Sequence, residues 1–459
     1  MSDNNNNNGK KKVERRPEVP GDEFFKFEKD EEAVCVKHAM VQNKKGGGGF
    51  LSMGGLFTSK GGYSGTSLAR YSVLLPDDPD FNTVSEIRRS AEGFRGVDPK
   101  MDRAIGSFVS MAIGDALGSP MEFRSVRYDD ANPILCDMGD PKAGSNFGLR
   151  PGQWTDDASM GACIADSLLW NGGFDPYDLK TRFVSWWNFG YNNATRRADE
   201  PGHSVGLGGN ISMSFSEFQS NGRVYTQEGD KNTSGNGSLM RNGAVAVYYH
   251  DDLATGLDVA RKQSYLTHQG TEAAELCAAL THLVIYAINN PDKGKEEILK
   301  AIGTEFKTDC ESVACLVRSE QEPGGDPNRN WQWMADEYRY APKRAQMQPG
   351  YVGSYAMDAL AMALHCVWKT STYREALLMA ANRCGDADSV CDITGQIAGA
   401  IYGYSAIPPN WIDTLGTWDG GEFTVKGWKM YKKLPVRYPI IVEVDEDEDA
   451  SKPAAGGQS

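Results

Sequence analysis

The sequence has little that would cross-link the chain covalently or carry it into a membrane. Its nine cysteines are odd in number and scattered, and they include no C-x-x-C pair, which favours a reducing compartment over a disulfide framework. The N-terminus lacks the apolar stretch of a signal peptide, and the most apolar run, residues 273–288, is interrupted by Glu275 and His282. We expect a soluble cytoplasmic protein without membrane contact. A nuclear location is the alternative, because residues 10–16 form a basic cluster.

The sequence also has fewer basic than acidic side chains. The 48 basic side chains are outnumbered by 62 acidic ones, which gives a formal net charge of -14. A protein that binds nucleic acid in general needs a basic surface to neutralise phosphates, so we expect no nucleic-acid partner. Hydrophobic residues make up 40% of the sequence, which is ordinary for a globular protein. We expect the protein to be a monomer.

Alternating patterns typical of strands are nearly absent. Apolar residues recur at helical spacing from about residue 98 to residue 415, which predicts a compact all-α bundle of many helices. These helices are rich in alanine, glycine, cysteine and methionine, which permit close packing. Only residues 223–227, 422–426 and 438–444 suggest short strands.

Two extensions flank the helical region. Residues 1–97 form an N-terminal extension with a glycine-rich segment at 44–66, and residues 416–459 form an irregular appendage with an acidic tail. Polar and glycine-rich segments bury too little apolar surface to offset the entropy lost on ordering. We therefore expect a domain at residues 98–415 between largely flexible or irregular extensions.

An acidic cluster begins one of the predicted helices. Thr155, Asp156 and Asp157 directly precede an apolar-periodic run over residues 160–168. Helix capping is one explanation, since threonine and aspartate are favoured at N-caps and in first turns. One cap needs only one such residue, however, and this site supplies three oxygen-bearing side chains in a row.

A second cluster repeats this arrangement further along the chain. Asp386, Asp388 and Ser389 precede another apolar-periodic run, although Ser389 and Asp392 could instead form a capping box. Carboxylate and hydroxyl ligands without a nearby histidine suit a hard cation such as Mg²⁺ or Mn²⁺. The similarity of the two clusters favours metal binding over two separate caps.

Three further features carry polar groups near predicted helix ends. Gly118 and Pro120 end a helix and place Glu122 on a loop, where its carboxylate can face a site. Residues 234–242 include a glycine-rich loop that can offer backbone N–H groups to phosphate. His268 precedes another helix. Each feature alone also has an ordinary structural explanation.

The order of these elements resembles the ADP-ribosylglycohydrolase family. The chain reads GDALGxPxEF, GQWTDDxxM, GNGSLMR, TH before a helix, and GDADS followed by GxxAGAxYG, over about residues 102–415. The resemblance implies an all-α, compact orthogonal multi-helix bundle. It also implies two Mg²⁺ ions, or Mn²⁺ as the alternative, held by Thr155, Asp156, Asp157, Asp386, Asp388 and Ser389. The family usually has threonine where this chain has Ser389, and the hydroxyl is preserved.

The resemblance also implies a substrate and its binding residues. ADP-ribose would bind through a diphosphate cradle, a loosely matched glycine pair at 208–209 and a pocket histidine. The cradle and histidine residues are Thr233, Ser234, Gly235, Asn236, Gly237 and His268. The partner would be an ADP-ribosylated protein or ADP-ribose itself.

The implied reaction is hydrolysis of the glycosidic bond between ADP-ribose and its acceptor. Residues 149–157 and 240–242 look most like bacterial arginine-directed members, so we expect ADP-ribosylarginine as substrate. We expect Glu122 or Asp157 to orient or deprotonate the attacking water. Serine-linked ADP-ribose and O-acetyl-ADP-ribose are alternative substrates. Two alternatives without catalysis are also open: a crystallin-like relative without activity, and a module that only binds ADP-ribose.

Overall fold

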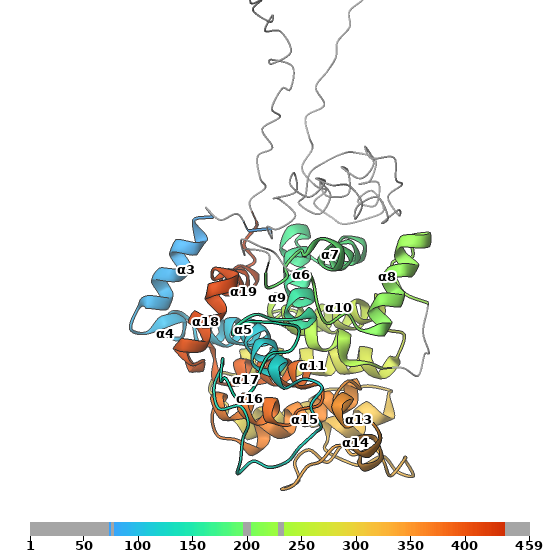
Figure 1. Ribbon diagram of the computed structural model, residues 1–459. Helices are drawn as coiled ribbons and strands as arrows, with labels where there is room; N and C mark the ends of the chain where they lie inside the picture. The colour runs from blue at the N-terminus through green and yellow to red at the C-terminus, as the bar shows by residue number, and fades with distance from the viewer. Residues whose placement is uncertain (1–72, 75–77, 196–202, 228–233, 437–459) are drawn as a thin grey trace, which may run out of the picture.

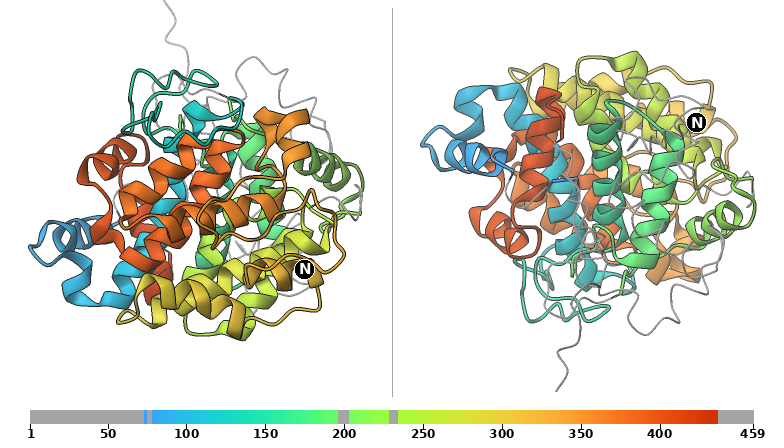
Figure 2. Two further views of the ribbon diagram at one scale, coloured as in Figure 1. Left: turned by 90° about the horizontal axis from the view of Figure 1, so that it is seen from below. Right: turned by 90° about the horizontal axis from the view of Figure 1, so that it is seen from above.

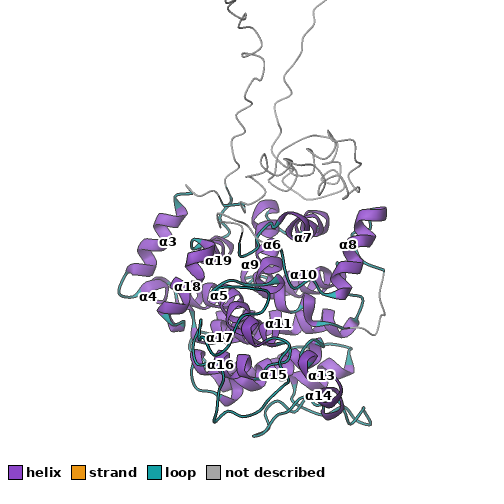
Figure 3. Ribbon diagram, in the orientation of Figure 1, coloured by secondary structure: helices purple, strands orange, loops and turns teal. Residues whose placement is uncertain are grey.

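The computed structural model describes residues 73–74, 78–195, 203–227 and 234–436. Within these ranges the chain forms helices and connecting loops and contains no strand, which confirms the all-α prediction (Figures 1 and 3). The nearest approach to sheet pairing there is one isolated antiparallel bridge between Gly235 and Tyr355. The glycine-rich segment at 44–66 and the acidic tail, together with the rest of residues 1–72 and 437–459, lie outside the described residues.

The α-helices follow one another from the N-terminal to the C-terminal part of the described chain. The first group is α3 (Asp80–Arg89), α4 (Gly93–Val97), α5 (Pro99–Gly118), α6 (Asp156–Asn171), α7 (Pro176–Phe189), α8 (Gly209–Asn221), α9 (Gly243–Tyr248) and α10 (Leu253–Tyr265). The second group is α11 (Thr271–Asn289), α12 (Lys295–Glu305), α13 (Glu311–Val317), α14 (Pro342–Met347), α15 (Ala356–Lys369), α16 (Tyr373–Asn382), α17 (Ala387–Tyr402), α18 (Pro409–Asp419) and α19 (Glu422–Lys432).

Helices α5 and α17 pack against each other at the centre of the bundle, with backbone touching backbone (Figures 1 and 2). Small residues recur at every fourth position on both contact faces, which places them on one side of each helix. On α5 these are Gly106, Ser110, Gly114 and Gly118, and on α17 they are Ala387, Cys391, Gly395 and Gly399. A Cβ atom on Gly114 would overlap the Cys391 carbonyl group, and one on Gly118 would overlap that of Ala387. The end of α5 therefore lies beside the beginning of α17.

Helix α11 is the one described helix long and apolar enough to cross a membrane by length and composition. However, 78% of its apolar window is buried inside the protein, where α11 packs against α10 and α17. Burial of this kind is typical of a core helix. The eight described cysteines are all free, as the sequence predicts, and Cys163 and Cys277 are buried in the core.

Helix α19 corrects two expectations about the C-terminal part of the chain. Residues 422–426 form no strand, and residues 416–432 form no irregular appendage: they belong to helices α18 and α19, apart from the turn at Gly420 and Gly421 between them. The Asp419 carboxylate accepts hydrogen bonds from the backbone N–H groups of Gly421 and Phe423, both at 2.8 Å, and so starts the helix. Phe423 then packs on Trp154 with ring centroids 5.2 Å apart. Five residues of alternation are too few to distinguish a strand from the start of an amphipathic helix.

The prediction of a strand at residues 223–227 is also wrong. This segment is a loop tied to Glu217, whose carboxylate accepts hydrogen bonds from the Thr226 hydroxyl at 2.8 Å and the Gln227 N–H at 2.9 Å. The buried Glu217 carboxylate satisfies these hydrogen-bond donors, so the segment needs no partner strand. The segment at 438–444 lies outside the described residues.

We predict that Gly395→Ala destabilises the protein by roughly 1–3 kcal/mol, the usual cost of overpacking a tight core. A Cβ atom there would overlap the backbone carbonyl oxygen of Ser110, which has no room to move. Gly416→Ala is the matched control, because it lies in α18 with nothing within 4 Å of the added carbon. That control should stabilise the protein by about 0.5–1 kcal/mol through helix propensity. Urea unfolding measures both changes, and equal effects of the two variants would contradict the proposed close contact.

Candidate active site

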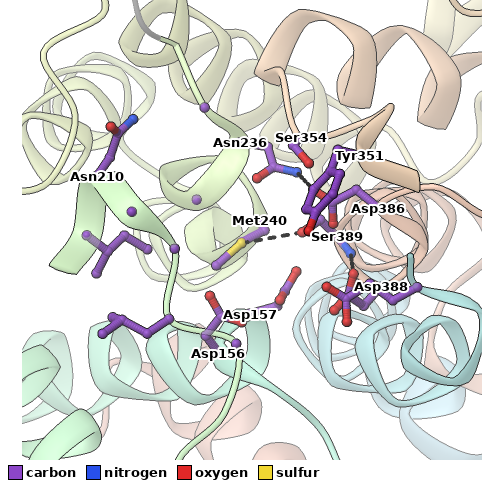
Figure 4. A pocket seen from close by; sticks show the side chains of 18 of the residues that line it. Asp156, Asp157, Asn210, Asn236, Met240, Tyr351, Ser354, Asp386, Asp388 and Ser389 are labelled. Carbon is purple, nitrogen blue, oxygen red and sulfur yellow. Dashed lines mark hydrogen bonds between the residues drawn. The ribbon is translucent and has the colours of Figure 1, made fainter. Parts of the chain in front are cut away.

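A pocket of about 500 Å³ opens where several helix ends converge, a size suited to a small-molecule ligand. Its walls come from the loop after α5, the beginnings of α6, α8 and α17, the glycine loop at 235–237 and the segment before α15. Figure 4 shows the side chains of Asp156, Asp157, Asp386 and Asp388 turned toward this shared space. The structure therefore brings the two acidic clusters together.

The beginning of α6 is capped from a different helix. The Asp115 carboxylate on α5 accepts hydrogen bonds from the backbone N–H of Thr155 at 2.9 and 3.0 Å and from that of Ala158 at 3.0 Å. Thr155 itself makes no capping bond. Asp156 and Asp157 are thus free of the capping role that their sequence position suggested.

The capping box considered for α17 does not form either. The helix begins at Ala387, so Ser389 lies inside the first turn and not at the N-cap. Asp392 instead accepts a hydrogen bond from the Gln396 side chain at 2.6 Å. The N-cap residue, Asp386, makes no capping bond and accepts a hydrogen bond from the Asn236 amide at 3.0 Å. Capping therefore explains neither cluster.

The carboxylates form two overlapping groups that could each hold a metal ion. One group is Asp115, Asp157 and Asp388; the other is Glu122, Asp386 and Asp388, and within each the facing oxygens lie within 4.8 Å of one another. Asp388 belongs to both groups. Glu122 Oε2 and Asp157 Oδ1 are buried without a hydrogen-bond partner in the described part of the chain. Buried carboxylate oxygens without donors are costly, and a hard cation would complete them.

The Thr155 hydroxyl lies among three of these carboxylates. Its oxygen is 3.0 Å from Asp115 Oδ1, 3.0 Å from Asp157 Oδ2 and 3.5 Å from Asp388 Oδ2. A hydroxyl has one proton and can donate to only one of the three. Asp115 already accepts backbone N–H bonds at both oxygens, so we interpret it as the residue that orients the cluster and the other carboxylates as the ligands.

Burial and mutual repulsion hold these acids toward their neutral forms. Burial, followed by the nearby Asp386 carboxylate, raises the pKa of Glu122 to about 8. Burial raises the pKa of Asp115 to about 7 despite its hydrogen bonds. The pKa values of Asp156, Asp157 and Asp388 are also raised well above the usual range, first by burial and then by neighbouring carboxylates. A bound cation would reverse this effect by favouring the ionised forms.

The glycine loop at 235–237 forms the opposite wall. The Asn236 N–H donates to the Ser354 carbonyl at 2.9 Å, and the Asn236 amide donates to the Gly353 carbonyl at 3.0 Å. The Ser234 carbonyl accepts from the Ala356 N–H at 2.9 Å, so Ser234 supports this loop and does not line the pocket. The loop is therefore held firmly by the segment before α15.

His268 lies directly behind this loop. Arg241 Nη2 donates to Thr267 Oγ1 at 2.8 Å, which leaves the Thr267 hydroxyl proton for His268 Nδ1, also at 2.8 Å. We assign the histidine proton to Nε2 on this basis. A Cβ atom on Gly235 would lie 3.4 Å from Nε2, so this nitrogen faces the loop. His268 can thus donate a hydrogen bond on the pocket side.

Two buried basic side chains lie near this histidine. Lys180 donates to the Leu266 carbonyl at 2.5 Å, and the Arg241 guanidinium lies 4.4 Å from the Phe183 ring centroid. Within the described ranges neither forms an ion pair with a carboxylate. Burial, with the charges of Arg241 and Lys180, lowers the pKa of His268 to about 3, so the ring is neutral. Burial lowers the pKa of Lys180 to about 7 and that of Arg241 to about 9, so Arg241 is the group that keeps its positive charge behind this end of the pocket at neutral pH.

The structure brings most of the predicted site residues to one pocket. Thr155 is buried just beneath it, and Thr233 lies outside the described residues. The pocket wall includes these predicted residues: Glu122, Asp156, Asp157, Asp386, Asp388, Ser389, Gly208, Gly209, Gly235, Asn236, Gly237 and His268.

Several residues of the site were not assigned a role from the sequence. Asp115 had a detectable signal, because it is the single charged residue in the apolar run at 107–118. Gly206 passes so close to Asp156 that a Cβ atom there would overlap its carboxylate. Phe123, the final residue of the GDALGxPxEF motif, lines the pocket mouth with Phe147 and Tyr351, and none of the three was assigned a role from the sequence.

The chain is similar to known proteins of one family. The sequence profile of the ADP-ribosylglycohydrolase family matches residues 97–430. An ADP-ribosylarginine hydrolase Tri1 of Pseudomonas putida is 31% identical, over 75% of this chain and 81% of that protein. The protein of that name in Serratia proteamaculans is 29% identical, over 74% and 84% of the two chains. A solved structure described as an ADP-ribosylglycohydrolase-related protein complex matches with a TM-score of 0.55 and 29% identity, over 73% of this chain and 99% of that one.

The chain therefore belongs to the ADP-ribosylglycohydrolase family. It is a glycosyl hydrolase that acts on ADP-ribosylated substrates, and its buried acidic clusters are compatible with a metal site. The family match extends to residue 430 and so includes most of α19, which packs against α5 and α6.

We predict that the cation-free protein loses stability as pH rises from about 4.5 to about 8 because of these carboxylates. Their folded pKa values are raised, for Glu122 from 4.5 to about 8 and for Asp115 from 3.8 to about 7. The folded protein therefore binds more protons than the unfolded chain across this window, and the free energy of unfolding falls with pH. A divalent cation should consequently raise Tm more near pH 8 than near pH 5, as scanning calorimetry can measure.

Asp388→Asn should weaken both the pH dependence and the response to cation, because both carboxylate groups share this residue. Asp336→Asn, at a fully exposed side chain, is the matched control and should behave like the wild type. Equal cation-induced Tm shifts at both pH values would contradict the prediction.

Proposed function

We propose that this protein hydrolyses the N-glycosidic bond between ADP-ribose and arginine side chains of modified proteins, with two Mg²⁺ or Mn²⁺ ions at the acidic clusters. The observation that carries the proposal is the pair of carboxylate groups that share Asp388 at one end of a pocket, opposite a glycine loop. The names of the two bacterial relatives support arginine as the acceptor.

The residues present fit a pair of hard cations. Six side chains offer oxygen ligands from two helix beginnings: Thr155, Asp156, Asp157, Asp386, Asp388 and Ser389. Buried oxygens of Glu122 and Asp157 lack donors, which is the deficiency that a cation would meet. Bound there, the cations would supply Lewis acidity, lowering the pKa of a water molecule and fixing the ribose hydroxyls.

The two ends of the pocket give ADP-ribose one orientation. The glycine loop, the Nε2–H of His268 and the buried charge of Arg241 favour the diphosphate at one end. The ribose bonded to the acceptor then reaches the carboxylates at the other end. Its anomeric carbon develops oxocarbenium character during cleavage, and the surrounding carboxylates stabilise that positive charge.

Glu122 is the better placed of the two candidate bases. Each keeps one oxygen without a partner, but Asp157 is almost fully enclosed and contacts the Thr155 hydroxyl, whereas Glu122 is 9% exposed and lies on the loop after α5. Glu122 can therefore accept the proton of the attacking water. An arginine leaving group is already cationic when bonded, so it departs as a neutral guanidine and gains its proton from solvent or from Glu122.

We predict that Glu122→Gln lowers kcat on the order of 10²–10⁴-fold, the usual contribution of a positioned general base. Asp388→Asn should abolish measurable turnover because it removes the carboxylate shared by both groups. ADP-ribose release from defined arginine-modified and serine-modified peptides, with and without EDTA, measures these effects. We expect release from the arginine peptide and loss of release on chelation.

Asp336→Asn controls for the loss of one negative charge, since its side chain is fully exposed. Wild-type activity in Asp388→Asn, or activity that survives EDTA, would refute the metal assignment. Release from the serine peptide alone would refute arginine as the acceptor and leave the metal assignment standing.

A further inference from the structure

Three aromatic side chains stand exposed together at the pocket mouth. Phe123, Phe147 and Tyr351, called here the aromatic wall, are 47%, 46% and 59% exposed. The ring centroids of Phe123 and Phe147 are 6.0 Å apart, and those of Phe123 and Tyr351 are 5.4 Å apart. All three line the pocket. Contiguous exposed apolar groups of this kind mark sites of interaction.

The backbone at two of these residues adopts an unfavourable conformation. Phe123 has φ of 63° and Phe147 has φ of 54°, in the left-handed region that bulky side chains rarely occupy. Neither residue gains burial in return, because about half of each side chain is exposed. Strained backbone that does not serve the core is concentrated at functional sites.

The surrounding loops hold the aromatic wall in place. The Phe123 N–H donates to the Gly385 carbonyl at 2.9 Å, next to the second acidic cluster. The Asn146 amide donates to the Glu122 carbonyl at 2.8 Å, which ties the Phe147 loop to the Phe123 loop. A Cβ atom on Gly350 would lie 2.6 Å from the Phe123 carbonyl oxygen, so the segment that carries Tyr351 also packs closely there. The rings are therefore presented on a fixed framework.

The position of the wall relative to the carboxylates defines what it can touch. Phe123 directly follows Glu122, and Figure 4 shows Tyr351 beside Asp386, across the pocket from Asn210. ADP-ribose oriented with its diphosphate near the positively charged end fills the pocket as far as the carboxylates. The acceptor bonded to its anomeric carbon must then leave the pocket past Glu122, where the aromatic wall lies.

We propose that the aromatic wall binds the guanidinium group of the acceptor arginine and thereby selects arginine over uncharged acceptors. A planar cation is attracted to the faces of phenylalanine and tyrosine rings. A serine acceptor offers neither the charge nor the plane. This inference rests on the proposed arginine-directed activity and adds the residues that determine the acceptor.

The test replaces Phe123 and Phe147 by asparagine, singly and together. Asparagine removes the ring and tolerates a positive φ, so the backbone is not strained further. Each single variant should raise KM for an ADP-ribosylarginine peptide about 3- to 30-fold, the range expected for one lost cation–π contact. The Kd for free ADP-ribose, measured by calorimetry, should change less than about twofold, because the wall contacts only the acceptor.

Two comparisons separate cation recognition from a structural role. Phe123→Tyr keeps an aromatic ring at this position, so its KM should stay near the wild-type value. Agmatine should compete with the arginine peptide in the wild type and lose that competition in the Phe123→Asn variant, whereas its uncharged ureido analogue should compete in neither. Trp187→Asn removes an exposed ring that does not line the pocket and should leave KM unchanged.

The outcomes distinguish this inference from the proposed function. If the wild type releases ADP-ribose from arginine peptides but Phe123→Asn leaves KM unaltered, the aromatic wall has no role in acceptor choice. If the variant weakens free ADP-ribose equally, the wall binds ADP-ribose and the inference is wrong. If the wild type does not cleave arginine-linked ADP-ribose at all, the proposed function fails and the inference fails with it.

Discussion

The close contact between α5 and α17 is the constraint on which the active site depends. Glycine at 114 and 118 lets the backbone of α17 approach that of α5, so the C-terminal end of one helix meets the N-terminal end of the other. That meeting places Asp115 and Glu122, from α5 and the loop after it, beside Asp388 from α17. With larger residues between the helices, the same carboxylates would be too far apart to share a ligand. The small residues thus serve the chemistry as much as the packing.

Charge is distributed along the pocket with a polarity that matches the proposed substrate. Carboxylates gather at the N-terminal ends of α6 and α17, where the helix dipoles partly offset their repulsion. The opposite end has Lys180 and Arg241 buried behind a glycine loop. A molecule with an anionic diphosphate at one end and a cationic acceptor at the other fits this polarity in one direction only. The orientation of ADP-ribose in the proposed function rests on this polarity.

The sequence predicts the helices and both acidic clusters because these are local patterns. Helical periodicity survives in a single chain segment, and three oxygen-bearing residues in a row exceed what one cap needs. The role of Asp115 could not be predicted, since its partners Thr155 and Ala158 lie forty or more positions away. The positive φ of Phe123 could not be predicted either, because it follows from loop contacts with Gly385. Local patterns locate the candidate site residues, whereas contacts with distant residues set their orientation.

The ambiguity between helix caps and metal ligands shows why that distinction matters. A carboxylate at a helix start is satisfied when it accepts backbone N–H bonds, and it then has little need of a cation. Here Asp115 supplies that function to α6 from a neighbouring helix, and Asp157 consequently keeps a buried oxygen without a donor. Moving the cap to another helix leaves Asp157 at this helix start with a buried oxygen that no N–H group satisfies. The buried acids are thus stable in their ionised forms only when positive charge is brought to them, which couples the stability of this fold to its chemistry.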